Sequence, residues 1–306
     1  MPAAWVHRLA VMTVAATVFL LFVGAVVTSK GVGLAVPDWP TTFGHNMFLF
    51  PWARMVGGVF YEHSHRLVAS GVGFLTLLLA VLLWISEPRR WVQWLGTFAL
   101  FLVIVQGVIG GLRVVFVEQW FAVVHAGLAQ AFFGLIVALA LFTSDRWRRE
   151  SHSVTVTGAA RVQRLCVLTT MLIYFQAIVG ALVRHTGVAI EVHVLVAFLV
   201  VFHVFLVGRR IVSIDSPRGE LRHPVVWLGS LLVLQLMLGV GSYLARFSTF
   251  APEWSPAVMV ALTTSHVVTG ALMLAVTVAL TLWSFRLLQP DERRVPTVVL
   301  SQRASA

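Results

Sequence analysis

The sequence predicts an all-α protein that spans a membrane eight times. Hydrophobic residues make up 59% of its 306 residues and charged residues only 11%. With a mean hydropathy of +0.91, the chain has too little polar surface to coat a water-soluble protein of this length. An internal repeat further predicts that the eight helices form two similar four-helix bundles.

Apolar segments of about 20 residues, the length that crosses roughly 30 Å of hydrocarbon, recur along the chain. We expect spans near residues 8–28, 62–85, 93–114, 120–143, 162–184, 190–209, 224–246 and 257–286. Each is expected to be helical, because in lipid only a helix satisfies its own backbone hydrogen bonds within one segment. The first span ends at Thr28-Ser29-Lys30 without a signal-peptidase site, so we expect it to stay as a membrane anchor.

The placement of arginine predicts the orientation of the chain. Most of the 22 Lys and Arg residues fall in connections on the side of the N-terminus, which the positive-inside rule assigns to the cytoplasm. We therefore expect a multi-pass protein of the plasma (inner) membrane with a cytoplasmic N-terminus. The formal net charge of +10 does not indicate a nucleic-acid partner, because no basic run is interleaved with aromatic residues.

Two matches define the internal repeat. The segment that begins Val23-Gly24-Ala25 recurs 156 positions later as Val179-Gly180-Ala181, and both copies close a span at the outer face. Gln106 and Gly110 in the third span recur with the same spacing in the seventh span, as Gln235 and Gly239. Spans 1–4 therefore correspond to spans 5–8.

The repeat sets the expected architecture. Each half contains an even number of spans, so both are expected to have the same orientation, as parallel bundles related by an axis along the membrane normal. The predicted halves are residues 1–150 and 151–306. The longest irregular piece, residues 29–61, is expected to lie over the outer face as a lid.

Four of the eleven histidines occupy equivalent places in this repeat. His65, His125, His193 and His266 lie in the second, fourth, sixth and eighth spans, one in each, toward the outer end. Two imidazoles that face each other across a bundle suit the two axial positions of a haem iron. A lone histidine in a membrane helix is more often a hydrogen-bonding residue or a proton relay, but four at matched places favour two haem sites. His203, about 280° around its helix from His193, is expected to be structural.

The motif Glu62-His63-Ser64-His65-Arg66 places ionisable groups together. Glu62 precedes His65 by three residues and Arg66 by four, so all three share one face of a helix. Charged groups cost about 2.5 to 3.5 kcal/mol each at the centre of a membrane helix, so such a cluster indicates a function. The simpler interpretation is an ion pair that only anchors the helix. Ile190 occupies the position of Glu62 in the second half, which assigns the predicted chemistry to the first half.

The positive-inside rule does not explain six cations that fall on the predicted outer side. They are Lys30, Arg54, Arg66, Arg113, Arg184 and Arg246. They either snorkel to outer headgroups or bind an anionic ligand such as a propionate. His63 and His185, at outer helix ends, are candidates for the same rim.

These residues resemble the haem A synthase family. The resemblance rests on the outer string Val36-Pro37-Asp38-Trp39-Pro40-Thr41-Thr42-Phe43-Gly44-His45-Asn46, on the Glu62–Arg66 motif and on Gly180-Ala181-Leu182-Val183-Arg184-His185-Thr186-Gly187, and nearly the whole chain is covered. It implies an oxidoreductase that oxidises the C8 methyl of haem O to the formyl of haem A, for use by cytochrome oxidases.

The resemblance also implies roles for single residues. Glu62 would be catalytic, His65 and His125 would hold the substrate haem, and His193 and His266 would hold a haem b cofactor. The expected propionate or rim contacts are Arg66, Arg113, Arg184, Arg246 and His185. Expected partners are haem O, haem A and membrane lipid, with haem O synthase, a quinol or other electron donor, and a homo-oligomer left open.

The chain departs from the family in two places. Many members carry cysteine pairs in outer loops, whereas this chain has one cysteine, Cys166, within an apolar segment. Its outer connection from Arg184 to Glu191 is also short, which puts a lid over the second haem in doubt.

Two other classes stay open at this stage. A di-haem cytochrome b-type quinol oxidoreductase also uses histidine pairs, but it normally places two ligands on one helix. A transporter built from paired bundles would use the histidines as proton relays.

Overall fold

The computed structural model describes residues 4–149, 153–214, 219–249 and 251–290. Within these ranges, eight helices are long and apolar enough to cross a membrane, which confirms the predicted fold class. They are α1 (Ala4–Ser29), α2 (Gly57–Ser86), α3 (Arg90–Phe116), α4 (Gln119–Thr143), α6 (Ala159–Thr186), α7 (Ile190–Val212), α8 (Gly219–Phe247) and α9 (Pro256–Leu287). Each predicted span lies within one of these helices.

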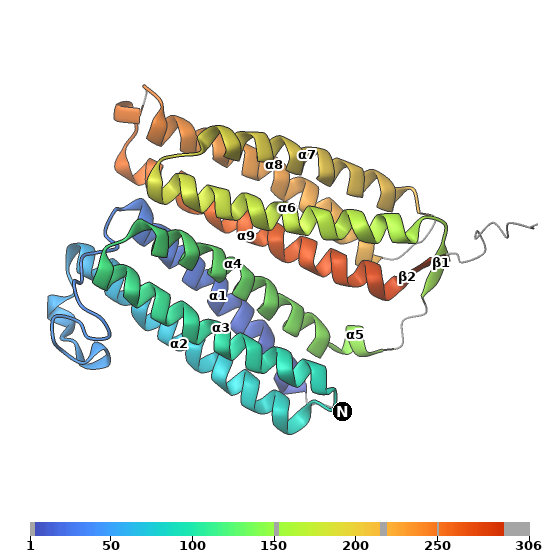
Figure 1. The fold of residues 1–306 in the computed structure, drawn as a ribbon, viewed down its shortest axis with the longest axis horizontal. Helices are drawn as coiled ribbons and strands as arrows, with labels where there is room; N and C mark the ends of the chain where they lie inside the picture. Colours follow the sequence, from blue (N-terminus) through green and yellow to red (C-terminus); the bar gives the residue numbers. More distant parts are fainter. Residues whose placement is uncertain (1–3, 150–152, 215–218, 250, 291–306) are drawn as a thin grey trace, which may run out of the picture.

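The long helices form two bundles that lie side by side, α1–α4 and α6–α9 (Figure 1). In the first bundle α1 packs on α2, α2 on α3, α3 on α4, and α4 back on α1. The second bundle repeats this cycle with α6, α7, α8 and α9. Between bundles, α1 packs on α9 and α4 on α6, while α4 also contacts α9. If each helix is replaced by its counterpart in the other half, the α1–α9 contact becomes the α6–α4 contact. The packing between the bundles therefore follows the internal repeat.

Short elements complete the described chain. They are the helix α5 (Asp145–Arg148), the 3-10 turns η1 (Met47–Leu49), η2 (Trp52–Arg54) and η3 (Ala251–Glu253), and the strands β1 (Val154–Val156) and β2 (Leu288–Pro290). The two strands pair in parallel, with Val154 opposite Leu288. This small sheet is a departure from the all-α expectation, and it joins the segment after α5 to the end of α9.

Apolar side chains are divided between the bundle interiors and the outward faces. Ile136 and Leu79 are buried in the first bundle and Leu228 in the second. Large apolar side chains on the outward faces stay exposed, with Phe198 at 70% and Met237 at 68%. Such faces are stable when a bilayer, rather than water, surrounds them.

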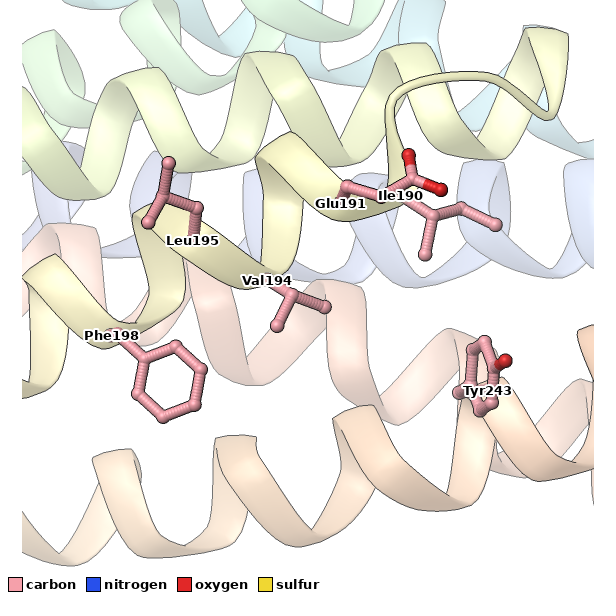
Figure 2. Close-up of a pocket in the computed structure, with 6 residues that line it drawn as sticks. All are labelled: Ile190, Glu191, Val194, Leu195, Phe198 and Tyr243. Carbon is pink, nitrogen blue, oxygen red and sulfur yellow. The ribbon is translucent and has the colours of Figure 1, made fainter.

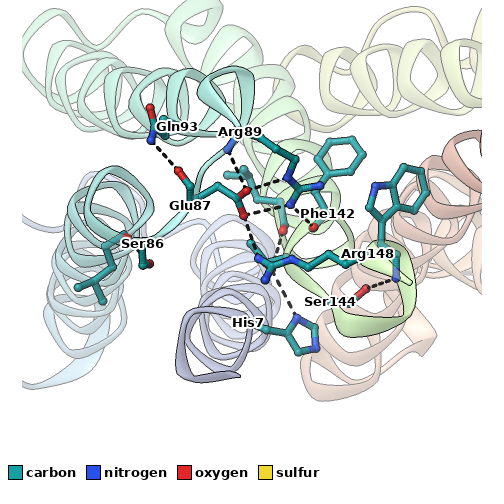
Figure 3. A network of polar contacts seen from close by, with 12 residues as sticks. His7, Ser86, Glu87, Arg89, Gln93, Phe142, Ser144 and Arg148 are labelled. Carbon is teal, nitrogen blue, oxygen red and sulfur yellow. Dashed lines mark hydrogen bonds and ion pairs between the residues drawn. The ribbon is translucent and has the colours of Figure 1, made fainter. Parts of the chain in front are cut away.

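An ion-pair network fixes the end of the first bundle where α2 joins α3 (Figure 3). The Glu87 carboxylate is almost fully buried, and it accepts hydrogen bonds from Arg89 Nε (2.7 Å) and Arg148 Nη2 (2.8 Å). Arg89 also donates to the Phe142 carbonyl at 2.7 Å. Burial alone would raise the pKa of Glu87, but the hydrogen bonds and positive charges of these arginines outweigh it and lower the pKa below its ordinary value. The network ties the α2–α3 connection to α4 and α5.

Candidate functional site

Each of the four repeat-equivalent histidines packs against a glycine on the preceding helix. An ideal Cβ on Gly24 would lie 3.0 Å from His65 Cε1, and one on Gly110 would lie 3.1 Å from His125 Cε1. The second half repeats this arrangement: the corresponding distances are 3.0 Å from Gly180 to His193 and 3.1 Å from Gly239 to His266. Real Cβ atoms rarely come so close to a ring, so glycine at these positions lets the imidazoles seat between helices.

In the second half the two imidazoles lie next to each other, with the edge of one ring toward the other. The ring centroids of His193 on α7 and His266 on α9 are 6.2 Å apart, with the ring planes inclined by 72°. When two imidazoles bind one metal from opposite sides, each nitrogen lies about 2 Å from the metal, and each ring centroid lies roughly 1 Å beyond its nitrogen. The two ring centroids are then about 6 Å apart. The pair therefore has a spacing at which both rings can bind one iron from opposite sides.

The four histidines differ in whether their Nδ1 atom has a hydrogen-bond partner in the protein. Nδ1 of His65 and His193 is buried and makes no hydrogen bond within the described residues, whereas His266 lies near the backbone of Gln235. Likewise, His125 Nδ1 lies 3.1 Å from the Gln106 carbonyl. An orphaned buried nitrogen is costly, so the rings of His65 and His193 fit a metal or a further polar group better than a purely structural role.

Glutamines one turn before the glycines fix the backbone of the histidine helices. Gln106 Nε2 donates to the His125 carbonyl at 3.1 Å, and Gln176 Nε2 donates to the His193 carbonyl at 2.9 Å. The Gln176 amide also lies 3.4 Å from His193 Nε2, a long contact that a ligand on this ring would replace. Gln235 lies against Gly270 on α9, one turn beyond His266.

In the first half, His65 and His125 also lie close together. Both residues are half-buried between helices, and the two are near enough to interact electrostatically. Arg113 on α3 acts on both rings. Within the described residues no cluster of three or more His, Cys, Asp or Glu side chains could hold a bare metal ion. A pair of imidazoles is suited to a metal whose remaining ligands belong to a larger group such as a porphyrin.

The segment that joins α1 to α2, residues 30–56, covers the first site; we call it the lid segment. Arg66 on α2 holds it through backbone carbonyls, since Nη1 donates to Asp38 (2.8 Å) and Thr41 (3.1 Å) and Nη2 to Val36 (3.2 Å). The same Nη2 donates to Glu62 Oε1 at 2.8 Å. The predicted Glu62–Arg66 pair is thus confirmed, and Arg66 has four acceptors in the protein.

Both oxygens of Glu62 are engaged. Oε1 accepts from Arg66, while Oε2 accepts from the Val36 N–H of the lid segment at 2.9 Å. The side chain is 4% exposed, so the carboxylate is held below the lid segment, one helical turn before His65. Glu62 joins the lid segment to the helix that carries a candidate ligand.

Close packing adds to these hydrogen bonds. The Trp39 indole rests on Gly111, where an ideal Cβ would come within 2.2 Å of Trp39 Cδ2. Gly111 follows Gly110, so Trp39 lies beside the His125 contact. Gly33 packs against the Arg113 guanidinium, whose Nη1 donates to the Gly33 carbonyl at 3.2 Å. The lid segment thereby contacts α3 as well as α2.

His63 lies under the lid segment rather than on a hydrated rim as the sequence suggested. It is 1% exposed, and its Nδ1 lies 3.1 Å from Thr42 Oγ1. Phe50 covers the ring, with centroids 5.1 Å apart. The water expected at this helix end is excluded because the lid segment folds over it.

Asp38 shapes the tip of the lid segment. Its carboxylate accepts from the Phe43 N–H (2.7 Å), the Gly44 N–H (2.9 Å) and the Thr41 hydroxyl. Burial would raise the pKa of Asp38, but these hydrogen bonds outweigh that effect and lower it below its ordinary value. The turn that carries Trp39 is thereby fixed.

The outer cations differ in how many acceptors the protein gives them. Arg184 donates to the Ala25 carbonyl (2.6 Å), Ser29 Oγ (2.8 Å) and the Thr263 carbonyl (3.4 Å), so it joins α6 to α1 and α9. Arg246 donates to the Arg184 carbonyl at 3.2 Å. Arg184, like Arg66, is largely taken up by protein groups, whereas Arg113 and Arg246 keep more donors for a ligand.

His185 lies between the two candidate sites. It is near enough to interact electrostatically with Arg113 and His125 of the first half and with Arg184 and Arg246 of the second. These groups form a positively charged region between the bundles at the outer end. An anionic group of a ligand in either site would be attracted there.

The second half has an open groove where the first half has its ion pair. The groove lies between α7 and α8 (Figure 2) and is lined by Ile190, Glu191, Val194, Leu195, Phe198 and Tyr243. Counted from the histidine of each half, Ile190 and Val194 stand at the positions of Glu62 and Arg66. The Glu191 carboxylate turns away from Tyr243 (Figure 2). The groove is therefore apolar where the first site is charged.

The fold and the paired histidines define a class: a multi-pass helical membrane protein with two histidine-pair sites in a duplicated bundle. The model of the COX15-CtaA family, described as cytochrome oxidase assembly protein, matches residues 7–194. The chain therefore belongs to the COX15-CtaA family.

Curated relatives from three organisms, each named heme A synthase, resemble this chain. The protein of Shouchella clausii is 29% identical over 187 residues, 59% of each chain. That of Geobacillus kaustophilus is 26% identical over 252 residues, 74% of this chain and 76% of its own. That of Lysinibacillus sphaericus is 33% identical over 181 residues, 56% and 57% of the two chains. The chain thus spans a little under three fifths of the length of the first and third relatives.

Two features of the site were missed by reasoning from the sequence. The glycine behind each histidine was used as a marker of the repeat, although its presence in every copy is the signal that could have revealed the contact. The backbone acceptors of Arg66 carry no sequence signal, because carbonyl groups are the same in every residue.

Proposed function

We propose that the chain is a haem A synthase, a membrane oxidoreductase that converts the C8 methyl of haem O into the formyl of haem A for use by cytochrome oxidases. The observation that carries this proposal is the asymmetry of the duplicated site. Both halves carry a glycine-backed histidine pair, but the first half alone has a carboxylate at the Glu62 position, one turn from a histidine and under the lid segment. The names of the relatives support the same activity.

The proposal divides the chain by role. Residues 1–150 bind the substrate, with haem O and its product haem A held by His65 and His125. Residues 151–306 bind a haem b cofactor through His193 and His266, whose spacing fits an iron porphyrin. When bound, this cofactor supplies one-electron transfer. Arg113, Arg246 and His185 bind propionates, while Arg66 and Arg184 chiefly hold the protein around them.

Glu62 carries the chemistry in this proposal. Oxidation of the methyl withdraws electrons and a proton from that carbon, and a fixed carboxylate nearby stabilises the developing positive charge or accepts the proton. In each of two successive hydroxylations of this carbon, water or activated oxygen supplies the hydroxyl oxygen; if the source is O2, two electrons and two protons from the donor reduce its second oxygen atom to water. The resulting gem-diol loses water to leave the aldehyde. The lid segment keeps bulk water away from this carboxylate.

The partners and the location belong to the same proposal. The protein lies in the plasma (inner) membrane with its N-terminus in the cytoplasm and both sites toward the outer face. It takes up haem O and releases haem A, while haem O synthase, a quinol or another electron donor, and a second copy of the chain stay open as partners. A cytochrome b-type quinol oxidoreductase is disfavoured, because all four histidines lie near one end of the bundles, at the starts of α2, α4, α7 and α9.

Pigment analysis tests the function. Protein purified from cells that make haem O should yield haem b together with haem O or haem A on acid–acetone extraction and chromatography. Glu62→Gln should bind the same haems yet accumulate haem O. A purified protein with no haem absorption band, or a Glu62→Gln variant that forms haem A at the wild-type rate, contradicts the proposal.

A further inference from the structure

We propose that Arg66 is a positioning residue that joins Glu62 and the lid segment into one unit, so that the carboxylate is correctly oriented when the lid segment is closed. The inference rests on the proposed function and adds a residue and a segment to its catalytic site. Arg66 is central because its guanidinium contacts both partners: three lid-segment carbonyls and Glu62 Oε1.

The two partners are also joined directly. The Val36 N–H donates to Glu62 Oε2 at 2.9 Å, and Arg66 Nη2 donates to the Val36 carbonyl at 3.2 Å. Val36 is therefore held through both of its peptide groups, one by the acid and one by the base of the same ion pair. If the lid segment moves away, the carboxylate loses one of its two fixing hydrogen bonds and Arg66 loses three of its four acceptors.

Shape explains why arginine is needed at this position. Its two terminal nitrogens point to four acceptors that lie in different directions, and a planar fork with five N–H groups can meet them together. Lysine carries the same charge but offers a single nitrogen. Lysine at residue 66 should therefore keep the pairing with Glu62 and lose part of the hold on the lid segment.

The rest of the structure shows what the unit encloses. Trp39, between two of the carbonyls that Arg66 binds, rests on Gly111 beside the Gly110–His125 contact. Closing the lid segment thus packs an indole on α3, next in sequence to the glycine that contacts His125, and fixes Glu62 in the same movement. The second half provides the comparison within the chain, because Ile190 and Val194 replace the acid and the base and line an open groove.

Hydrogen exchange of the full-length protein tests the link without relying on activity. Arg66→Gln should speed exchange in peptides covering residues 36–44 by about tenfold, the effect of losing a hydrogen bond of roughly 1.5 kcal/mol. Arg66→Lys should fall between this variant and the wild type. Arg54→Gln is the matched control, since it removes the same charge but the Arg54 guanidinium contacts His45 of the lid segment itself rather than α2. Glu62→Gln should also speed exchange at Val36.

Haem O conversion tests the consequence for catalysis. Arg66→Gln should lower kcat by about 100-fold, as expected for a misplaced catalytic group, while KM for haem O changes much less, and Arg66→Lys should recover part of kcat. Faster lid-segment exchange with normal kcat overturns the proposal, and so does a lowered kcat with unchanged exchange. Faster exchange throughout the helices would mark unfolding and also count against it.

The two proposals fail in distinguishable ways. If the wild type converts no haem O, the proposed function is wrong, yet the exchange comparison still decides whether Arg66 and Glu62 hold the lid segment. If the wild type converts haem O but Arg66→Gln and Glu62→Gln exchange like the wild type at residues 36–44, only the inference about Arg66 is wrong.

Discussion

Gly239 of α8 and His266 of α9 lie in direct contact, so that a Cβ on the glycine would come within 3.1 Å of the imidazole Cε1. The contact occurs in the same form at the other three histidines. It makes the second site unusually sensitive to a single methyl group.

We predict that Gly239→Ala displaces His266 and weakens the second site. Extra atoms in a well-packed interior cost about 1 to 3 kcal/mol, and here the nearest atom that can move is a candidate ligand. The haem b absorption band of the purified protein should fall or shift. Gly229→Ala on the same helix is the control, since an added Cβ there meets nothing within 4 Å. Equal spectra for both variants would refute the assignment.

The histidines themselves give a second prediction. His193→Ala and His266→Ala should each abolish the haem b band, because each removes one of two opposing ligands. His203→Ala, ten residues along α7 from His193, should retain it. His203 also has an unpartnered buried Nδ1, so it tests whether an orphaned nitrogen without an opposing ring is enough. Loss of the band in His203→Ala alone would reverse the assignment.

The packing of Trp39 on Gly111 gives a third prediction. Gly111→Ala places a Cβ at 2.2 Å from the indole, so the ring must move and the lid segment must loosen. Exchange at residues 36–44 should accelerate while the haem b band in the second half stays unchanged. Gly107→Ala, one turn earlier on α3 with nothing within 4 Å, should leave exchange at the wild-type rate. Unchanged exchange in Gly111→Ala would show that Trp39 does not hold the lid segment.

The Glu87 network predicts a dependence of stability on pH. The pKa of Glu87 is lowered in the folded protein from its ordinary value of 4.5. Its contribution is therefore fully present above about pH 4.5 and is lost as the pH falls through the lower, folded pKa. Glu87→Gln should lose of the order of 3 kcal/mol at neutral pH, because it removes the buried carboxylate that Arg89 and Arg148 share.

Thermal unfolding in detergent at several pH values checks this prediction. The difference in Tm between wild type and Glu87→Gln should be largest near pH 7 and should shrink below pH 4.5. Glu191→Gln is a suitable control, because Glu191 is at the exposed start of α7 and is outside the network. A difference in Tm that does not change with pH would contradict the ionised state of Glu87.

The eight helices and the pairing of halves could be predicted because both depend on composition and spacing. A run of some 20 apolar residues has one stable form in lipid, and an even number of spans fixes the orientation of the second copy. The position of His65, His125, His193 and His266 on alternate helices followed from the same spacing. The Glu62–Arg66 pair followed from helical geometry alone.

The details of the lid segment could not be predicted in this way. Arg66 was expected at a propionate, but it bonds to carbonyls of residues 36, 38 and 41, which lie 25 or more residues away in sequence. His63 was placed at a hydrated rim for the same reason: an irregular segment of nearly 30 residues gives no periodic signal of where it folds back. The short strands β1 and β2 likewise depend on a contact between segments more than 130 residues apart in sequence.

The duplication of the bundle in one orientation sets both histidine pairs at the same end of the helices, and therefore at a similar height in the bilayer. A charge that passes from one pair to the other moves sideways, parallel to the membrane surface. Such a movement does no work for or against the transmembrane voltage, which acts along the membrane normal. Transfer between the two sites should proceed equally well in energised and de-energised membranes.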